Sequence, residues 1–365
     1  MSKDMTKNKI ASLQGVRAIA FMCVFLSHVA GIKSGGLGVS IFLVLSGFVL
    51  KINHSNYISE LSVKTCYTEA IKRIKRLYIL HLLMFIWALP DCWHRLSWTN
   101  FIKVSISVLK IISNIFLFQS WIPKSEFYFS FNAVSWYLSV MIFLYFVFPY
   151  LNKSVMNCSY KIIIQRISLI IILQITIAGI LFFLRGLFVN IPMEISDDLP
   201  KWITYILPIY RMTEFYEGIL LGAVYENKKN HNVCEKIIFL QILSIILIPV
   251  SAYLGEYYFS SIYCIKYSLI YIPCSILLIY SMSNNVCISR IISAKLFIII
   301  GELSGIAFLL HQRIISVVVE LNLFNKYQII YNTITSFAVT MVLSYFYIEL
   351  EKMIIGHKVK NENKK

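Results

Sequence analysis

The sequence is poor in charged residues, which make up only 14% of its 365 positions. An average soluble domain carries about 25%, whereas hydrophobic residues here reach 58%. No polar stretch is long enough to fold as a separate soluble domain. The shortage of charge therefore excludes a soluble globular protein and indicates an integral membrane protein. We expect one membrane domain over residues 1–352 and a basic cytoplasmic tail over 353–365.

Cysteines with metal-ligand spacing are also lacking. The eight cysteines form no CxxC motif and show no repeated spacing, so they give no sign of a metal site or a disulfide framework. Cysteine in such a setting is more often a small apolar residue. We expect neither a bound metal nor a resident cofactor.

Acidic residues are scarce as well, with 18 Asp and Glu against 34 Lys and Arg. The resulting net charge of +16 would suit nucleic acid, but the basic residues cluster in short loops between apolar runs. That distribution encodes the orientation of a protein in a bilayer and favours contact with anionic lipid. We therefore expect the lipid bilayer as a partner, and no nucleic acid.

Long apolar runs are the abundant feature of the sequence. A run of about 17–25 apolar residues can span a bilayer as a helix, and the sequence predicts about ten such spans. The expected fold class is an all-α polytopic integral membrane protein. The predicted spans are 13–32, 36–52, 75–91, 133–151, 167–189, 202–225, 237–255, 262–282, 295–319 and 328–348.

Lys and Arg residues predict the orientation of these spans. With both termini in the cytoplasm, the cytoplasmic segments hold 22 of the 34 basic residues and the outer segments hold seven. Such an excess follows the positive-inside rule. An eleventh span at 101–118 would invert every later loop and remove the excess, so we predict an interfacial amphipathic helix there.

Arg17 and His28 lie within the first apolar run. Their separation of eleven residues corresponds to a rise of about 16 Å along nearly the same face of a helix. Ionisable groups at membrane depth are costly and usually mark a function. A neutral imidazole can act as a general base, and a guanidinium can hold an anion. The alternative is a snorkelling arginine and a histidine with structural hydrogen bonds.

A second basic pair, Arg73 and Arg76, lies at the cytoplasmic start of the third span. Residues three apart on a helix share a face. Two guanidinium groups on one face suit a phosphorylated ligand such as a nucleotide-containing thioester donor. An ordinary positive-inside loop is the alternative interpretation.

The sixth span carries three charged residues. Arg211 and Glu214 are spaced for an ion pair, and Glu217 continues the same helix face. A structural buried ion pair is the alternative to a pocket here. Gly218 and Gly222 form an edge of small residues that predicts close approach of a neighbouring helix.

The remaining candidate pocket residues are scattered along the chain. His311 lies in the ninth span, where a core histidine satisfied by hydrogen bonds is the alternative interpretation. Aromatic side chains such as Trp136 can stack against sugars, although 23 Tyr and 25 Phe make aromatic placement uninformative. The other candidates are Ser46 and Glu302.

Seven segments together resemble the membrane acyltransferase 3 family. They occur in the family's order and cover nearly the whole chain, beginning with the Arg-x10-His signature. The segments are LQGVRAIAFMCVFLSH, GGLGVSIFLVLSGF, RIKR, SWYLSVMIFLYFVFPY, PIYRMTEFYEGILLG, GIAFLLHQ and SYFYIELEK.

The resemblance implies a multi-pass enzyme of the bacterial inner membrane. Members transfer an acyl group, usually acetyl, from cytoplasmic acyl-CoA to a hydroxyl of a cell-surface or lipid-linked carbohydrate, such as capsule, exopolysaccharide or O-antigen. The implied partners are therefore acyl-CoA as co-substrate, a glycan acceptor and possible polysaccharide-assembly proteins. By the same resemblance, His28 is the essential histidine, Arg17 is its partner, and Arg73 and Arg76 engage the donor.

The chain departs from the common family pattern at Ser40 and Met141, where many members carry acidic residues. If His28 lacks the acidic partner found elsewhere, the candidates to replace it are Glu214, Glu217 and Glu302.

Two other functions fit intramembrane charge. A glycan or lipid transporter would use these residues as a substrate pathway and would consume no acyl-CoA. A scaffold protein of polysaccharide assembly would use them structurally and would tolerate the loss of His28.

Overall fold

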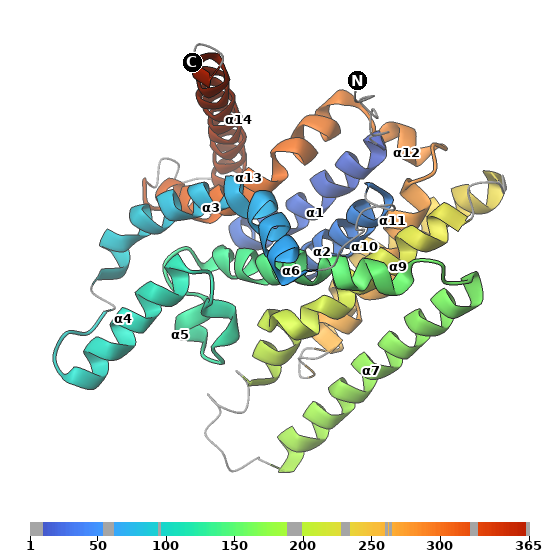
Figure 1. Ribbon diagram of the computed structural model, residues 1–365, viewed down its shortest axis with the longest axis horizontal. Coiled ribbons are helices and arrows are strands. Elements are labelled where there is room, and N and C mark those ends of the chain that lie inside the picture. The colour runs from blue at the N-terminus through green and yellow to red at the C-terminus, as the bar shows by residue number, and fades with distance from the viewer. Residues whose placement is uncertain are drawn as a thin grey trace.

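The computed structural model describes residues 10–53, 62–93, 96–187, 199–227, 234–259, 262, 265–321 and 328–362. Within these ranges all regular elements are helical and none is a strand. Figure 1 shows the arrangement of the helices. The predicted all-α fold is confirmed.

The longer helices follow the predicted apolar runs. They are α1 (Ala11–Val29), α2 (Gly35–Asn53), α3 (Val63–Trp93), α4 (Phe101–Ile115), α6 (Trp136–Val155), α7 (Tyr160–Leu187), α9 (Pro208–Asn227), α10 (Cys234–Tyr257), α11 (Ile272–Met282), α13 (Lys295–Leu321) and α14 (Gln328–Glu362). Short elements connect them. They are the 3-10 helices η1 (Gln119–Trp121) and η2 (Ala133–Ser135), the π-helices η3 (Trp202–Ile206) and η4 (Ile265–Leu269), and the single turns α5 (Ser125–Tyr128) and α12 (Ile288–Ile291).

Eight helical segments of the described chain are long and apolar enough to cross a bilayer. They lie at 11–29, 35–53, 133–155, 160–184, 235–257, 265–282, 295–321 and 328–354. The predicted count of about ten is not confirmed. The predicted spans 75–91 and 202–225 coincide with α3 and with η3–α9, but α9 holds four charged residues and the first half of α3 is rich in Lys and Arg.

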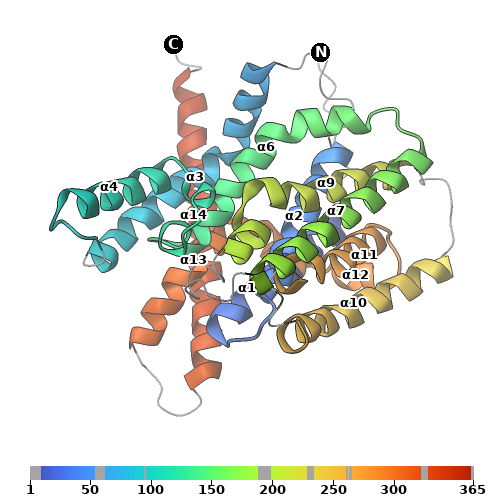
Figure 2. The same ribbon diagram turned by 90° about the horizontal axis from the view of Figure 1, so that it is seen from below.

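The helices divide into a packed centre and an apolar periphery. In the membrane-length segments of α1, α2 and α13, between 56% and 67% of residues are buried, against 17% in α7 and α10 and 22% in α14. Exposed Ile, Leu and Phe side chains cover the three peripheral helices. An apolar helix surface exposed on this scale suits lipid rather than water. Figures 1 and 2 show α4 at one end of the longest axis, with α7 and α10 reaching towards the other.

Glycines allow α9 to pack directly on α2. A Cβ atom built on Gly218 would lie 2.0 Å from the Val44 carbonyl oxygen, and one on Gly47 would lie 2.0 Å from the Phe215 carbonyl oxygen. A Cβ on Gly222 would lie 2.8 Å from the Lys51 side chain. The predicted close approach at the small-residue edge of α9 is therefore confirmed.

The helix pair α1–α13 positions the candidate site. A Cβ atom on Gly301 would lie 2.0 Å from the Gln14 carbonyl oxygen, so the two backbones touch near their starts. Further along, Phe21 and His28 of α1 both contact His311 of α13 through their rings. The two helices therefore run in the same direction and place their histidines side by side.

Helix α4 lies within the predicted interfacial segment 101–118. Its 15 residues extend about 22 Å, less than the roughly 30 Å of a bilayer core. Phe101 and Ile102 are strongly exposed, whereas the polar residues Ser113 and Asn114 are buried against the protein. An outward apolar face on a short helix favours the interfacial position.

The first turn of α1 and the last turn of α14 lie towards the same side of the molecule in both views (Figures 1 and 2). An even number of spans requires this arrangement. That the shared side is cytoplasmic stays a prediction. Helix α14 continues to residue 362, so no break in secondary structure marks the expected start of the tail at 353.

Candidate functional site

A cavity of about 250 Å³ lies between α1, α2, α3, α6 and α13. The 17 residues around it include five of the predicted site residues. These are Arg17, Ser46, Arg73, Arg76 and Glu302. Three arginines from two helices thus face one space, together with the carboxylate-bearing side chain of Glu302.

Helix α3 presents Arg73 and Arg76 to the cavity one turn apart. Arg73 Nη2 lies 3.8 Å from a carboxylate oxygen of Glu69, and Arg76 Nε lies 2.5 Å from one of Glu351 on α14. The two arginine side chains remain 18% and 41% exposed. Ion pairs that are partly exposed are weak, so an entering phosphate can compete with these carboxylates.

Aromatic rings line the cavity where it approaches the histidines. The ring centroids of Phe42 and Phe308 lie 6.0 Å apart, and that of Tyr137 lies 5.1 Å from Phe308. Ser46, a turn after Phe42 on α2, donates its hydroxyl to the Phe42 carbonyl at 2.7 Å. These residues come from α2, α6 and α13 and give the arginine-lined cavity an apolar end.

His28 and His311 form a pair beyond this aromatic end. Their ring centroids lie 5.1 Å apart. His28 is exposed in the last turn of α1, whereas His311 is fully buried on α13. The Phe308 ring, which lines the cavity, lies 5.8 Å from the His311 ring. One aromatic layer therefore separates the histidine pair from the arginines.

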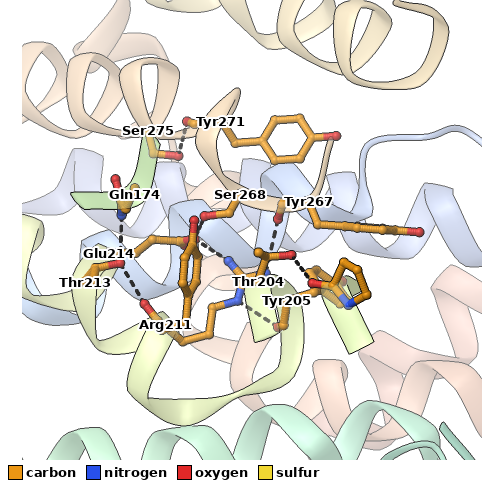
Figure 3. A network of polar contacts seen from close by, with 12 residues as sticks. Gln174, Thr204, Tyr205, Arg211, Thr213, Glu214, Tyr267, Ser268, Tyr271 and Ser275 are labelled. Carbon is orange, nitrogen blue, oxygen red and sulfur yellow. Dashed lines mark hydrogen bonds and ion pairs between the residues drawn. The ribbon is translucent and has the colours of Figure 1, made fainter. Parts of the chain in front are cut away.

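A second polar cluster surrounds Arg211 and Glu214, as Figure 3 shows. The two side chains are fully buried and form an ion pair. Arg211 also donates to the Tyr205 carbonyl at 2.7 Å and to that of Tyr267 at 3.2 Å. Ser268 donates to Glu214 at 2.5 Å. The ion pair thereby connects α9 to η3 and η4. This arrangement agrees with the alternative interpretation of these residues as a structural buried ion pair.

Glu217 and Trp136 lie with this cluster and do not line the arginine cavity. Glu217 is fully buried one turn along α9, beside Gln174 of α7. The Trp136 ring lies 4.9 Å from the Tyr205 ring. Four of the predicted pocket residues therefore belong to a separate region.

Among the described residues, no three His, Cys, Asp or Glu side chains gather as metal ligands.

Sequence reasoning missed the cavity residues Phe42, Tyr145 and Phe308. With 25 phenylalanines and 23 tyrosines in the chain, residue type alone does not single them out. A usable signal existed for Phe308, because it precedes His311 by three residues and so shares its helix face.

Comparison with known proteins identifies the family. The family described as an acyltransferase domain matches residues 10–348, from the start of α1 into α14. The chain belongs to the acyltransferase 3 family. Membership in the acyltransferase 3 family confirms the resemblance drawn from the seven segments. The description of that family names acyl transfer, and eight helical segments of the described chain are long and apolar enough to cross a bilayer.

One curated relative supports the acyltransferase 3 assignment. Acyltransferase MdmB from Streptomyces mycarofaciens is 26% identical over 245 residues, which cover 59% of this chain and 57% of that protein. The match thus spans little more than half of either sequence. No solved structure gives a significant match.

Proposed function

We propose that this protein transfers an acetyl group from cytoplasmic acyl-CoA to a hydroxyl of a cell-surface or lipid-linked carbohydrate at the bacterial inner membrane. One observation carries the proposal. Arg17, Arg73 and Arg76 line a cavity whose aromatic end adjoins the pair of His28 and His311. Anion binding at one end and a candidate base near the other match the two ends of an acyl-CoA molecule.

The arginine end of the cavity suits the phosphates of CoA. Guanidinium groups bind phosphate through paired, charge-assisted hydrogen bonds. From Arg17 to His28 the helix rises about 16 Å, and the extended pantetheine arm has a comparable length of about 15–20 Å. With its phosphates at Arg73 and Arg76, a bound donor would direct its thioester along α1 towards His28.

His28 acts as the general base in this proposal. Its neutral imidazole takes the proton of the sugar hydroxyl while the oxygen attacks the thioester carbonyl carbon. The new carbon–oxygen ester bond forms as the carbon–sulfur bond breaks, and CoA leaves as a thiolate. The thiolate then receives the proton from the His28 imidazolium, which returns the enzyme to its starting state.

Exposure of His28 supports access for a large acceptor. The ring lies at the end of α1 opposite the arginines and is exposed, whereas His311 beside it is fully buried. An acceptor can therefore reach His28 without entering the arginine-lined cavity. A glycan chain, which can present a single hydroxyl group to an exposed ring, fits this arrangement.

Labelled acetyl-CoA tests the proposal. Membrane vesicles with wild-type protein or the His28→Ala variant receive acetyl-CoA labelled in the acetyl group, and the glycan and lipid fractions are extracted. We expect label in the acceptor with wild type and none with the variant. Label that remains on protein denatured rapidly at neutral pH, and that hydroxylamine releases, would indicate an acyl-histidine intermediate instead of direct attack. Substrate movement across the vesicle without label transfer would favour a transporter.

A further inference from the structure

His311 is a buried histidine whose second ring nitrogen has no partner. Its Nδ1 lies 2.8 Å from the Phe308 carbonyl oxygen and 3.2 Å from that of Ala307. Its Nε2 is buried and makes no hydrogen bond within the described residues. Leaving a buried polar atom unsatisfied costs about 1–3 kcal/mol, so such an atom calls for an explanation.

The carbonyl contacts fix the protonation of the ring. A carbonyl oxygen only accepts hydrogen bonds, so Nδ1 must carry the proton and donate. In a neutral imidazole Nε2 then holds a bare lone pair. The His311 side chain is 0% exposed, and a charged ring there would need a counter-charge. His311 is therefore a fixed hydrogen-bond acceptor.

The surroundings of this lone pair offer one polar ring. Within the described chain, the rings in contact with His311 are those of Phe21, Phe25, His28 and Phe308. Three of the four are phenyl groups. Of these four rings, that of His28 alone carries an N–H group that can donate to Nε2.

Carboxylates considered as partners of His28 lie elsewhere. Glu214 is paired with Arg211 in the second polar cluster, which we call the α9 cluster, and Glu217 also lies there. Glu302 lines the cavity together with Arg17. The residue whose ring lies beside His28 is instead the second histidine, His311.

We propose that His311 is the positioning residue for His28: its Nε2 accepts the N–H of the His28 ring. The second nitrogen of His28 is then left bare and turned towards the acceptor hydroxyl. The same N–H stays bonded to His311 after His28 takes up the substrate proton. This inference rests on the proposed acyl transfer and adds the residue that orients its base.

The geometry requires movement of one ring only. The His28 and His311 rings are inclined at 56° and are not yet hydrogen-bonded. His311 is held by the Phe308 carbonyl, whereas His28 is exposed at a helix end. Rotation of the His28 side chain towards Nε2 completes the contact. Catalytic hydrogen bonds commonly tighten in this way when substrate binds.

Two substitutions of His311 separate the role of Nε2, which accepts a hydrogen bond from His28, from the role of Nδ1, which donates to the Phe308 carbonyl. In His311→Asn the amide nitrogen can still donate to the Phe308 carbonyl, but no atom replaces Nε2. In His311→Gln the amide oxygen can occupy the Nε2 position. Should His311→Asn not fold, His311→Thr takes its place, because a threonine hydroxyl also bonds the carbonyl one turn earlier.

The assay measures label transferred from acetyl-CoA to the acceptor fraction of vesicles, over a range of acetyl-CoA concentrations. We expect His311→Asn to lower the maximal rate about 10–100-fold, the usual effect of losing an orienting partner. Its KM for acetyl-CoA should be unchanged, because the arginines are distant from the histidines. His311→Gln should stay within a few-fold of wild type. Thermal unfolding in detergent checks that each variant is folded.

His81 supplies a matched control. It is fully buried on α3, its Nε2 lies 2.9 Å from the Asn114 carbonyl oxygen, and it does not line the cavity. His81→Gln can keep that bond, so its transfer rate should equal the wild-type rate.

Three outcomes overturn the inference. A folded His311→Asn with the wild-type rate removes the acceptor role, and so does an equal loss in the folded Asn and Gln variants. In both cases the proposed function still holds if the wild-type protein transfers label and the His28→Ala variant does not. Wild-type protein that transfers no label overturns the proposed function, and the inference with it.

Discussion

Two groups of arginines in this molecule have opposite surroundings. Arg211 is 0% exposed, and its guanidinium bonds Glu214 and two backbone carbonyls. Arg17, Arg73 and Arg76 instead face a cavity of about 250 Å³. Both groups lie in the helical bundle, and both stand out in the sequence as costly charges.

The difference separates charges that the protein itself satisfies from charges that face a cavity. A buried charge whose partners are all supplied by the protein contributes to architecture, since breaking such a pair is destabilising. A charge that faces a cavity keeps part of its bonding capacity for a ligand. Substitutions in the α9 cluster should therefore lower the free energy of unfolding. Substitutions in the cavity and the histidine pair should instead weaken donor binding or lower the transfer rate.

The largest effect is expected at His28. His28→Ala should lower acetyl transfer by about 10²–10⁴-fold, because a general base contributes this much to the rate. The exposed ring adds little packing, so the unfolding temperature in detergent should match that of wild type. A variant that folds and transfers at near-normal rate would remove His28 from the reaction.

Arg211→Met should affect folding most strongly. It leaves Glu214 buried without its partner, which costs about 3–5 kcal/mol in free energy of unfolding. Replacing both residues, as in Arg211→Met with Glu214→Leu, should recover most of that loss because no charge remains. Detergent unfolding curves measure both variants. Equal stability of the single variant and wild type would contradict a structural role for the cluster.

Gly218→Ala tests the helix contact that supports the cluster. Its new methyl group would lie 2.0 Å from the Val44 carbonyl oxygen, so α9 and α2 must separate. Overpacking of this kind costs about 1–3 kcal/mol. Gly179 of α7 is the matched control, because a Cβ there meets no atom within 4 Å. Gly179→Ala should not lower the unfolding temperature.

Arg73→Ala should raise the KM for acetyl-CoA about tenfold, since a hydrogen bond to a charged group contributes about 1.5–3 kcal/mol. Arg76→Ala should act in the same direction. Lys72 is adjacent but 66% exposed and does not line the cavity, so Lys72→Ala should change the KM less than Arg73→Ala. An unchanged KM in both arginine variants would count against donor binding at this end.

Much of the fold could be predicted from the sequence, because lipid imposes strong constraints. Apolar length marks the helices, and the small-residue edge of Gly218 and Gly222 marks the α2–α9 contact. The number of spans was less accessible. Ten spans were predicted, whereas eight helical segments of the described chain are long and apolar enough to cross a bilayer. Helices α3 and α9, both predicted as spans, are not among the eight, and both carry several charged residues.

The candidate site could be predicted only in part. Spacing on one helix gathers Arg73 with Arg76, but the closeness of His28 and His311 depends on how α1 and α13 meet. Their backbones touch at Gly301 and Gln14, a contact between residues 287 positions apart in the sequence. For the same reason, helix spacing predicted the pairing of Arg211 with Glu214 but not that carbonyls of η3 and η4 complete it.

Donor binding by purified protein in detergent tests the contrast between the two arginine groups most directly. Calorimetric titration with CoA would compare wild type, Arg73→Ala with Arg76→Ala, and Arg211→Met with Glu214→Leu. We predict that CoA binding weakens about 100-fold or more in the first double variant, at roughly 1.5 kcal/mol for each lost contact. The second double variant should bind CoA as wild type does. Weakened binding in the second and normal binding in the first would contradict the assignment of the cavity as the donor site.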